Sequence, residues 1–531
     1  MDRNEGSSLK VENKIMKEKV PSEKVSFDNP IIWSDLPDLD VIRVKDVYYM
    51  VSTTMHLMPG CVILKSYDLI HWEIASYVYE TLEENKAHRL ERDEHIYGKG
   101  MWAASLRYYE GTFYVCFVAN DTGRTYLFQA ESIDGPWRKS YIEGFYHDSS
   151  LLFDEGKVYI VYGNTNIYLT ELKDDLSGPK EKGFHKMIIT DMDDVGLGYE
   201  GAHFYKIKDK YYIFLIHWLN YGSRRRVEAC YVADQVGGPY KGKNILDDDM
   251  GYHNAGVAQG GIVDTPDGSW YAMLFQDHGA VGRIPVLVPV SWKDDFPVFG
   301  VEGKVPHKIY SKSNLEAYVY APIVDSDSFE YRADYRGEIK LKKVWQWNHN
   351  PNDALWSVTE RKGYLRIKTG KISSHIMTAQ NVLTQRTMGP RCENTVCVDG
   401  SALKNGDFAG IAAFQGCFGF IALTKEDDQY YLVRCGKEKE GSEVLGKEYA
   451  RVKVVSPHVK LKVSFNFIDN IDEADFYYEN EGTWKKFGGT QKLYFLLDHF
   501  VGCRVALFLY ATKEIGGIVD FKDFEYKHLV R

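Results

Sequence analysis

A chain of 531 residues is longer than one hydrophobic core usually serves, so its length predicts two or more domains. The hydrophobic fraction of 44% and charged fraction of 26% are those of an ordinary globular protein, and a net charge of −10 argues against a nucleic-acid or anionic-membrane partner, because either would need a dense basic face. Aromatic residues, at 14%, favour a strand-rich architecture, and sugar binding by aromatic faces is the alternative reason for them.

Residues 1–27 contain neither an apolar stretch of signal-peptide length nor a small-residue cleavage site. They therefore predict a flexible N-terminal segment and a cytoplasmic protein. No later segment has the run of apolar residues that a membrane helix needs. Eight cysteines are scattered without any C-x-x-C spacing, which favours free thiols in a reducing compartment.

One short pattern recurs five times: a turn carrying Asp, Glu or Gly, followed by a strand of alternating aromatic and aliphatic residues. The copies cover residues 45–51, 110–116, 155–161, 208–214 and 267–273. Each copy follows another strand-like segment, so each indicates a β-hairpin. Spacings of roughly 45 to 65 residues leave room for four-stranded blades, which predicts a five-bladed β-propeller over residues 28–318. Two unrelated sandwiches with similar hairpins are the alternative.

The repeat stops around residues 306–322, and a different strand pattern follows. Strand-like runs at 364–368, 418–423, 430–434 and 504–510 are separated by polar turns, which predicts a β-sandwich over residues 326–531. Strong helical periodicity appears nowhere over a useful length. The expected fold class is therefore all-β.

Three acidic residues precede apolar strands in the same phase of the propeller repeat: Asp38, Asp148 and Glu200. Inner strands of a propeller converge on one axis, so acids far apart in sequence can meet there. Cleavage of a glycosidic bond needs one carboxylic acid to protonate the leaving oxygen and one carboxylate to activate water or attack carbon. A third negative group can keep the proton donor protonated. Taken singly, each acid is more often a turn or surface carboxylate, and the shared phase is what favours a site.

These segments resemble glycoside hydrolase family 43 over about residues 28–531. Residues 29–49 look like the family's N-terminal signature. Asp148-Ser-Ser-Leu resembles its Asp-Pro-Ser-Leu element, and Glu200-Gly-Ala-His resembles its Glu-Gly-Pro-His element. The resemblance implies that Asp38 is the general base, that Asp148 modulates a pKa, and that Glu200 is the general acid.

The resemblance also implies a sugar pocket. Trp102-Ala103 is similar to the family's Trp-Ala-Pro, whose Trp lines the pocket, and Gly282-Arg283 is similar to its substrate-contacting Gly-Arg. Residues 346–351 and 383–391 look like the concanavalin-like sandwich of the xylosidase and arabinofuranosidase branch. In that branch a Phe before a Gly closes the pocket, and Phe500 is in the similar segment, although a core aromatic explains it equally well. His56 either lines the pocket or caps its turn.

The sequence departs from the family pattern in ways that bear on cofactors. Gln259 stands where many members carry an axial His near a calcium ion. His253 or His278 could substitute, although a hydrogen-bonded structural histidine is the better explanation for either. We therefore predict no metal site and no required cofactor, and leave structural calcium near the propeller axis open.

The resulting hypothesis is an exo-acting, inverting glycoside hydrolase that releases terminal L-arabinofuranose or D-xylose from hemicellulose-derived oligosaccharides. Inversion requires room for water between base and sugar, so the two carboxyl groups should lie roughly 6.5 to 9.5 Å apart. The sandwich acts either as a lid on the pocket or as a carbohydrate-binding module. A non-catalytic sugar-binding propeller is the rival from another class, and the sequence does not separate arabinofuranose from xylose.

Overall fold

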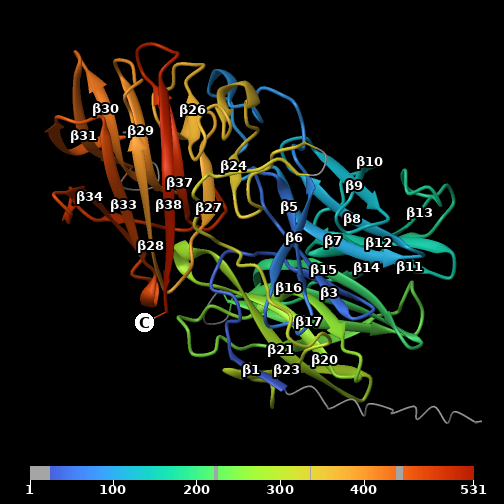
Figure 1. The fold of residues 1–531 in the computed structure, drawn as a ribbon. Coiled ribbons are helices and arrows are strands. Elements are labelled where there is room, and N and C mark those ends of the chain that lie inside the picture. The colour runs from blue at the N-terminus through green and yellow to red at the C-terminus, as the bar shows by residue number, and fades with distance from the viewer. Residues whose placement is uncertain (1–23, 221–224, 335–336, 438–445, 531) are drawn as a thin grey trace, which may run out of the picture.

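The computed structural model describes residues 24–220, 225–334, 337–437 and 446–530. Within these residues the regular structure consists of β-strands and a few single-turn 3-10 helices, so the expected all-β class is confirmed. Figure 1 shows two bodies packed side by side, a propeller in blue to green and a sandwich in yellow to red.

Five four-stranded antiparallel sheets follow one another along the chain and form the predicted five blades. Blades 1 and 2 consist of β2 (Asp40–Val44), β3 (Val47–Ser52), β5 (Gly60–Ser66) and β6 (Glu73–Tyr79), then β7 (Met101–Tyr109), β8 (Thr112–Ala119), β9 (Arg124–Ala130) and β10 (Arg138–Ile142). Blade 3 consists of β11 (Ser150–Asp154), β12 (Lys157–Asn164), β13 (Asn166–Leu172) and β14 (His185–Thr190). Blades 4 and 5 consist of β15 (Val195–Ile207), β16 (Lys210–Leu219), β17 (Arg226–Ala233) and β18 (Lys241–Leu246), then β19 (Ala258–Asp264), β20 (Trp270–Asp277), β21 (Arg283–Lys293) and β22 (Phe296–Phe299). First strands of neighbouring blades contact one another, β2 with β7 and β19, and β11 with β7 and β15, so the first strand of each blade lies nearest the axis.

The repeated sequence pattern is the turn and second strand of each blade. Its tight turn needs left-handed backbone, which glycine adopts at no steric cost. Gly111, Gly156 and Gly268 supply it with φ of 84°, 75° and 84°. At the preceding position of the turn, Lys45 and Lys208 are left-handed, each with φ of 56°, as are Glu110 and Glu155 with φ of 46° and 49°.

The propeller ring closes between blades 5 and 1. Leu39 forms a parallel bridge with Gly260, and Arg43 forms an ion pair with Asp264. Gly260 is required there because a Cβ would lie 1.8 Å from the carbonyl oxygen of Met273.

A two-stranded sheet outside the blades joins the beginning of the propeller to its end. Strand β1 (Lys24–Asp28) pairs with β23 (Lys308–Lys312) in antiparallel register. The expectation of a flexible segment over residues 1–27 is therefore wrong for residues 24–27, because their backbone is paired. Residues 1–23 lie outside the described residues.

The C-terminal half forms two packed sheets, as expected for a concanavalin-like sandwich. The first contains β24 (Gln346–Asn348), β27 (Leu383–Arg386), β29 (Asp407–Phe414), β30 (Gly419–Glu426), β31 (Gln429–Gly436), β32 (Lys447–Val454) and β37 (Arg504–Ala511). The second contains β25 (Trp356–Ser357), β26 (Leu365–Lys368), β28 (Arg391–Asp399), β33 (His458–Asn466), β34 (Glu473–Asn480), β35 (Thr483–Lys486), β36 (Gln491–Lys492) and β38 (Ile518–Leu529).

The propeller contributes a strand to the sandwich. Strand β4 (Leu57–Met58), in the loop between β3 and β5, pairs with β24 at the edge of the first sheet. A single buried apolar cluster includes Met58 and Phe117 of the propeller together with Trp347 and Leu383 of the sandwich. The two domains therefore share a core, and the loop carrying β4 is held by both.

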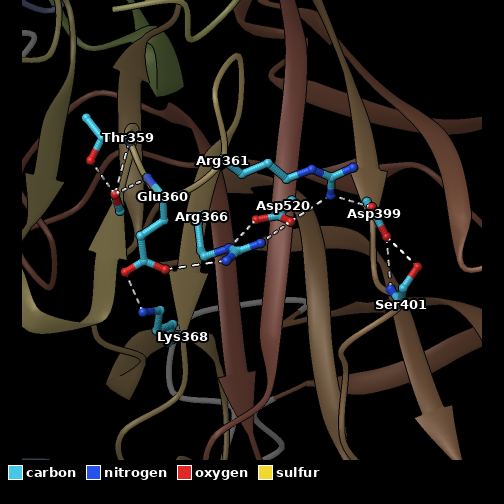
Figure 2. A network of polar contacts seen from close by, with 9 residues as sticks. Thr359, Glu360, Arg361, Arg366, Lys368, Asp399, Ser401 and Asp520 are labelled. Carbon is cyan, nitrogen blue, oxygen red and sulfur yellow. Dashed lines mark hydrogen bonds and ion pairs between the residues drawn. The ribbon is translucent and has the colours of Figure 1, made fainter.

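A network of charged side chains crosses three adjacent strands of the second sandwich sheet (Figure 2). Asp520 on β38 accepts hydrogen bonds from Arg366 on β26 and from Arg361, and Arg361 also reaches Asp399 on β28. Arg366 and Asp399 both lie directly opposite Asp520 in the strand register. Cross-strand pairs of opposite charge stabilise such a sheet.

None of the eight cysteines, all of which are described, forms a disulfide, and seven of them are buried. Among the described residues, none of the helices has the length and apolar character required to span a membrane.

Candidate active site

Asp38 lies just before the innermost strand of blade 1 and is buried. Its Oδ1 accepts a hydrogen bond from Nε2 of Gln259 at 3.1 Å and pairs with Nη1 of Arg283 at 3.0 Å. Its backbone is left-handed, with φ of 54°, a conformation that non-glycine residues seldom adopt outside turns and functional sites. Two neighbours thus hold one oxygen of this carboxylate, and one of them neutralises its charge.

Asp148 takes the equivalent place before the innermost strand of blade 3, also with left-handed backbone (φ 46°). Its Oδ2 accepts a hydrogen bond from the backbone N–H of Gly201 at 3.2 Å. Burial, together with the negative charges of Glu200 and Asp38, raises the pKa of Asp148 to about 7, against the opposing effect of His147. This carboxyl therefore changes charge near neutral pH.

Glu200 lies within β15, where the register shifts on both sides of it. Its Oε2 accepts a hydrogen bond from Nδ2 of Asn164 at 2.6 Å. The same oxygen lies 3.5 Å from Nε2 of His147. These two groups approach Oε2 and not the other carboxylate oxygen, Oε1.

Gly201 brings the three acids together. A Cβ at this position would lie 3.0 Å from the side chain of Gln259, so glycine lets blade 4 approach the axis. Its N–H binds Asp148, its neighbour is Glu200, and the Gln259 that it contacts binds Asp38. The structure therefore gathers the three predicted acids from blades 1, 3 and 4 at one end of the propeller axis.

His147 is a member of this group that the sequence-based prediction missed. Its Nε2 lies 3.8 Å from Oδ2 of Asp148 in addition to its approach to Glu200. Burial lowers the pKa of His147, but the charges of Asp148, Glu200 and Asp38 outweigh burial and raise the pKa to about 9. A cation therefore lies between the two acids at neutral pH. Its position directly before Asp148 is the signal that could have identified it.

Arg226 on β17 is the second missed residue. It forms an ion pair with Asp277. Burial and the nearby Arg283 lower the pKa of Arg226 to about 10, while Asp38 and Glu200 act in the opposite direction. The pocket therefore contains two arginines, one on each of blades 4 and 5.

Trp102, Arg283 and Phe500 form one wall beside the acids. The rings of Trp102 and Phe500 have centroids 5.6 Å apart, and the guanidinium carbon of Arg283 lies 4.5 Å from the centroid of Phe500. Nε1 of Trp102 and both Nε and Nη2 of Arg283 are buried without a hydrogen-bond partner among the described residues. Buried donors without partners are costly, so these three N–H groups are available to ligand oxygens.

His56 does not belong to this wall. It is fully buried, and its ring contacts are with Tyr97, His349 and His499. The expectation that His56 lines the pocket is not met, because the pairing of β4 with β24 turns this loop into the interface between the domains.

Two groups of described residues bring potential metal ligands within 4.8 Å of one another. One is His147, Asp148 and Glu200, which are two of the three acids and the histidine beside them. The other is Asp191, Asp193 and His217, in which Nδ1 of His217 already binds Asp191 at 2.9 Å.

His278 was a candidate substitute for the axial histidine. Its Nε2 lies 2.8 Å from Oε1 of Gln276, and burial lowers the pKa of His278 to about 3. That contact fits a structural histidine.

Comparison with known proteins gives matches to both halves of the chain. Residues 27–297 match the sequence profile of glycosyl hydrolases family 43, and residues 332–527 match that of the beta xylosidase C-terminal concanavalin A-like domain. A beta-xylosidase from Formosa agariphila is 28% identical over 95% of this chain and 90% of that protein. A non-reducing end alpha-L-arabinofuranosidase from Bacteroides ovatus is 29% identical over 65% of each protein.

A solved structure agrees with both matches. The bifunctional GH43-CE protein of Bacteroides eggerthii has a TM-score of 0.89 to this chain and 42% sequence identity, covering 96% of this chain. This chain covers 64% of that protein, which is less than two thirds of its length.

A five-bladed propeller that matches a glycosyl hydrolase profile, joined to a concanavalin-like sandwich, identifies the chain as a glycosidase. The chain belongs to glycosyl hydrolases family 43.

Proposed function

We propose that this protein is an exo-acting, inverting glycosidase that removes single terminal pentoses, L-arabinofuranose or D-xylose, from hemicellulose-derived oligosaccharides. The observation that carries the proposal is the meeting of Asp38, Asp148 and Glu200 beside buried, unpartnered N–H donors. The names of the relatives, a beta-xylosidase and an arabinofuranosidase, support pentoses as the substrate class.

In this proposal Glu200 is the general acid. Asn164 holds its Oε2, so the proton on Oε1 passes to the departing glycosidic oxygen. General acid catalysis of this kind contributes about 10²- to 10⁴-fold to the rate. Asp148 and His147, which lie beside it, adjust its charge environment.

Asp38 is the general base. It removes a proton from a water molecule that attacks the anomeric carbon on the face opposite to the leaving group, which inverts the configuration. Arg283 and Gln259 both bind Oδ1, so they hold the carboxylate in place and leave Oδ2 for the water.

The sandwich serves as a lid that blocks the far end of the pocket. Phe500 comes from the sandwich, yet its ring lies against Trp102 of blade 2 and Arg283 of blade 5. A pocket closed by such a wall accepts a chain end and excludes a continuous polysaccharide chain. This geometry favours the lid over a separate carbohydrate-binding module.

The test compares nitrophenyl α-L-arabinofuranoside with nitrophenyl β-D-xyloside, and follows the first-formed sugar anomer by NMR during hydrolysis of an oligosaccharide. We expect turnover of one or both pentosides and an anomer inverted relative to the substrate. A retained anomer would refute the assignment of Asp38 as a base that activates water. Sugar binding without turnover would establish the non-catalytic alternative.

A further inference from the structure

Two histidines meet across the boundary between the propeller and the sandwich. Nε2 of His56, in the propeller loop that carries β4, lies 3.1 Å from Nε2 of His499, which precedes β37 of the sandwich. The two residues are 443 positions apart, and their exposed fractions are 0% and 1%. This hydrogen bond is therefore a dry, long-range link between the domains.

The chemistry of the pair makes the link specific. One Nε2 must donate and the other must accept, so the two rings hold complementary tautomers. Burial and the neighbouring histidines lower the pKa of His56 well below its ordinary value, and burial lowers the pKa of His499 to about 3. Both rings are therefore neutral at the pH at which most enzymes work. The rings of Tyr97 and Phe414 pack against them, so no water replaces a lost partner at low cost.

The link lies directly behind the pocket wall on both sides. His499 is followed by Phe500, and His56 follows Met55, which packs in one apolar cluster with Val501, Trp102 and Phe500. The carbonyl of Met55 accepts a hydrogen bond from the N–H of Met101, the residue before Trp102. His499 is thus one residue from Phe500 of the wall, and His56 is one residue from Met55, which packs in the same apolar cluster as Trp102 and Phe500.

Phe500 itself needs support from its surroundings. Its φ of 55° is in the left-handed region, which is a strained conformation for a bulky aromatic residue. Its N–H donates to the carbonyl of Leu496 within the same loop. Its ring contacts Phe495 of the same loop, and Trp102 and Arg283 of the propeller. On the C-terminal side of Phe500, the N–H of Gly502 fastens the loop to Asp35 of the propeller. On the N-terminal side, His499 fastens it through the bond to His56, so both attachments bear on where the ring lies.

We infer that His56 and His499 are positioning residues: their hydrogen bond fastens the loop of Phe500 to the loop of Met55 and so sets the depth and width of the sugar pocket. This inference rests on the proposed function, because it assigns Phe500 to the pocket wall. The inference goes beyond the proposed function by assigning a role to two residues that do not contact the sugar.

The experiment compares variants of the full chain in hydrolysis of the preferred nitrophenyl pentoside. His499→Phe keeps a ring of similar size and removes the hydrogen bond, while His499→Gln keeps a polar group near the position of Nε2. We expect kcat/KM to fall on the order of ten- to a hundredfold in the Phe variant, mainly through KM, and to recover largely in the Gln variant. Phe500→Ala should give a similar loss, and the double variant should lose no more than either single variant, because both changes disable the same wall.

His349→Phe is the matched control. Its ring belongs to the same buried cluster, but its Nε2 accepts a hydrogen bond from the N–H of Ile96 rather than reaching the Phe500 loop. We expect it to lower Tm as much as His499→Phe while leaving KM near the wild-type value. A His499→Phe variant with lowered Tm and unchanged KM would overturn the inference and leave the pair a purely structural link.

Different results would refute the proposed function and the positioning role of His56 and His499. If the wild-type protein hydrolyses no pentoside, the proposed function fails. The positioning role is then measured by calorimetric binding of arabinose and xylose to the same variants, where a Kd unchanged by His499→Phe would overturn it.

Discussion

Two buried carboxylates in this protein have nearly equal exposure and opposite surroundings. Asp520 in the sandwich is 5% exposed and Asp148 in the propeller is 6% exposed. Asp520 faces two guanidinium groups, from Arg361 and Arg366, at 2.7 to 2.9 Å. Asp148 faces one imidazolium at 3.8 Å and the negative charges of two other acids. Burial alone therefore does not indicate a functional acid, and the sign of the neighbouring charge does.

The titration of neighbouring groups follows this difference. Asp399 belongs to the same network as Asp520. Burial raises the pKa of Asp399, but hydrogen bonds from Ser401 and Arg361 outweigh this effect and hold the pKa below its ordinary value. In the pocket, burial and like charges raise the pKa of Asp148 to about 7. The pKa of a buried carboxyl is thus lowered in the sandwich network and raised in the pocket.

The largest expected effect is the loss of the proton donor. Glu200→Gln should lower kcat on xylo- or arabino-oligosaccharides by about 10²- to 10⁴-fold, and much less on nitrophenyl glycosides, whose leaving group needs little protonation. Steady-state kinetics on both substrate types measures the difference. Equal losses on both would mean that Glu200 is not the acid, and an unchanged Tm would show that the fold is intact.

Removing the proposed base should lower kcat nearly as much, but the two substrate types should be affected differently than by Glu200→Gln. Asp38→Asn is expected to lower kcat by about 10²- to 10⁴-fold on both substrate types, because water must be activated whatever the leaving group is. The ratio of the two losses, compared with that of Glu200→Gln, separates base from acid. A loss confined to oligosaccharides would contradict the assignment.

Removing the structural carboxylate should affect stability instead of catalysis. Asp520→Asn leaves two arginines short of a charged partner and should cost about 1 to 3 kcal/mol of unfolding free energy, with kcat/KM unchanged. Denaturant unfolding and a nitrophenyl glycoside assay measure the two quantities. A comparable fall in activity would break the contrast between the two regions.

Removing the charge of Asp148 should raise the free energy of unfolding, whereas removing that of Asp520 should lower it. The pKa of Asp148 is about 7 in the folded state and 3.8 in the unfolded chain, so the folded state binds more protons between these values and ionisation of Asp148 lowers stability as pH rises. Asp148→Asn should therefore be more stable than wild type by on the order of 1 kcal/mol above pH 7, with reduced activity. The gain should shrink as pH falls and vanish near pH 4. A variant that is less stable than wild type at pH 8 would refute this explanation.

Much of the architecture could be predicted from local pattern. The turn-and-strand repeat at residues 45–51 and its four copies each became the first hairpin of a blade, because alternation along a strand and left-handed turns are local properties. The meeting of the three acids could be predicted as well, since Asp38 and Asp148 come just before the innermost strands of their blades and Glu200 lies within one. The one local signal for His147 was its position directly before Asp148. Arg226 had no such signal, because its surroundings include Arg283 and Asp38 from two other blades.

The placement of His56 shows the limit of the same reasoning. The sequence places it in a loop beside the pocket, and both a pocket residue and a turn cap are consistent with that position. Its actual partner, His499, is 443 residues away and belongs to the other domain. No local pattern encodes such a contact.

Strand periodicity and turn chemistry act over a few residues, so the amino-acid sequence was enough to predict the all-β class, the five blades, the sandwich and three candidate acids. Folding of the whole chain was needed to show which charged groups face one another, such as His147 beside Glu200 and the arginines around Asp520. It was also needed to show that Phe500 completes a wall from the second domain. The reason is electrostatic and steric. A pKa and a pocket wall both depend on distances of a few ångströms between groups that the chain separates by tens to hundreds of residues.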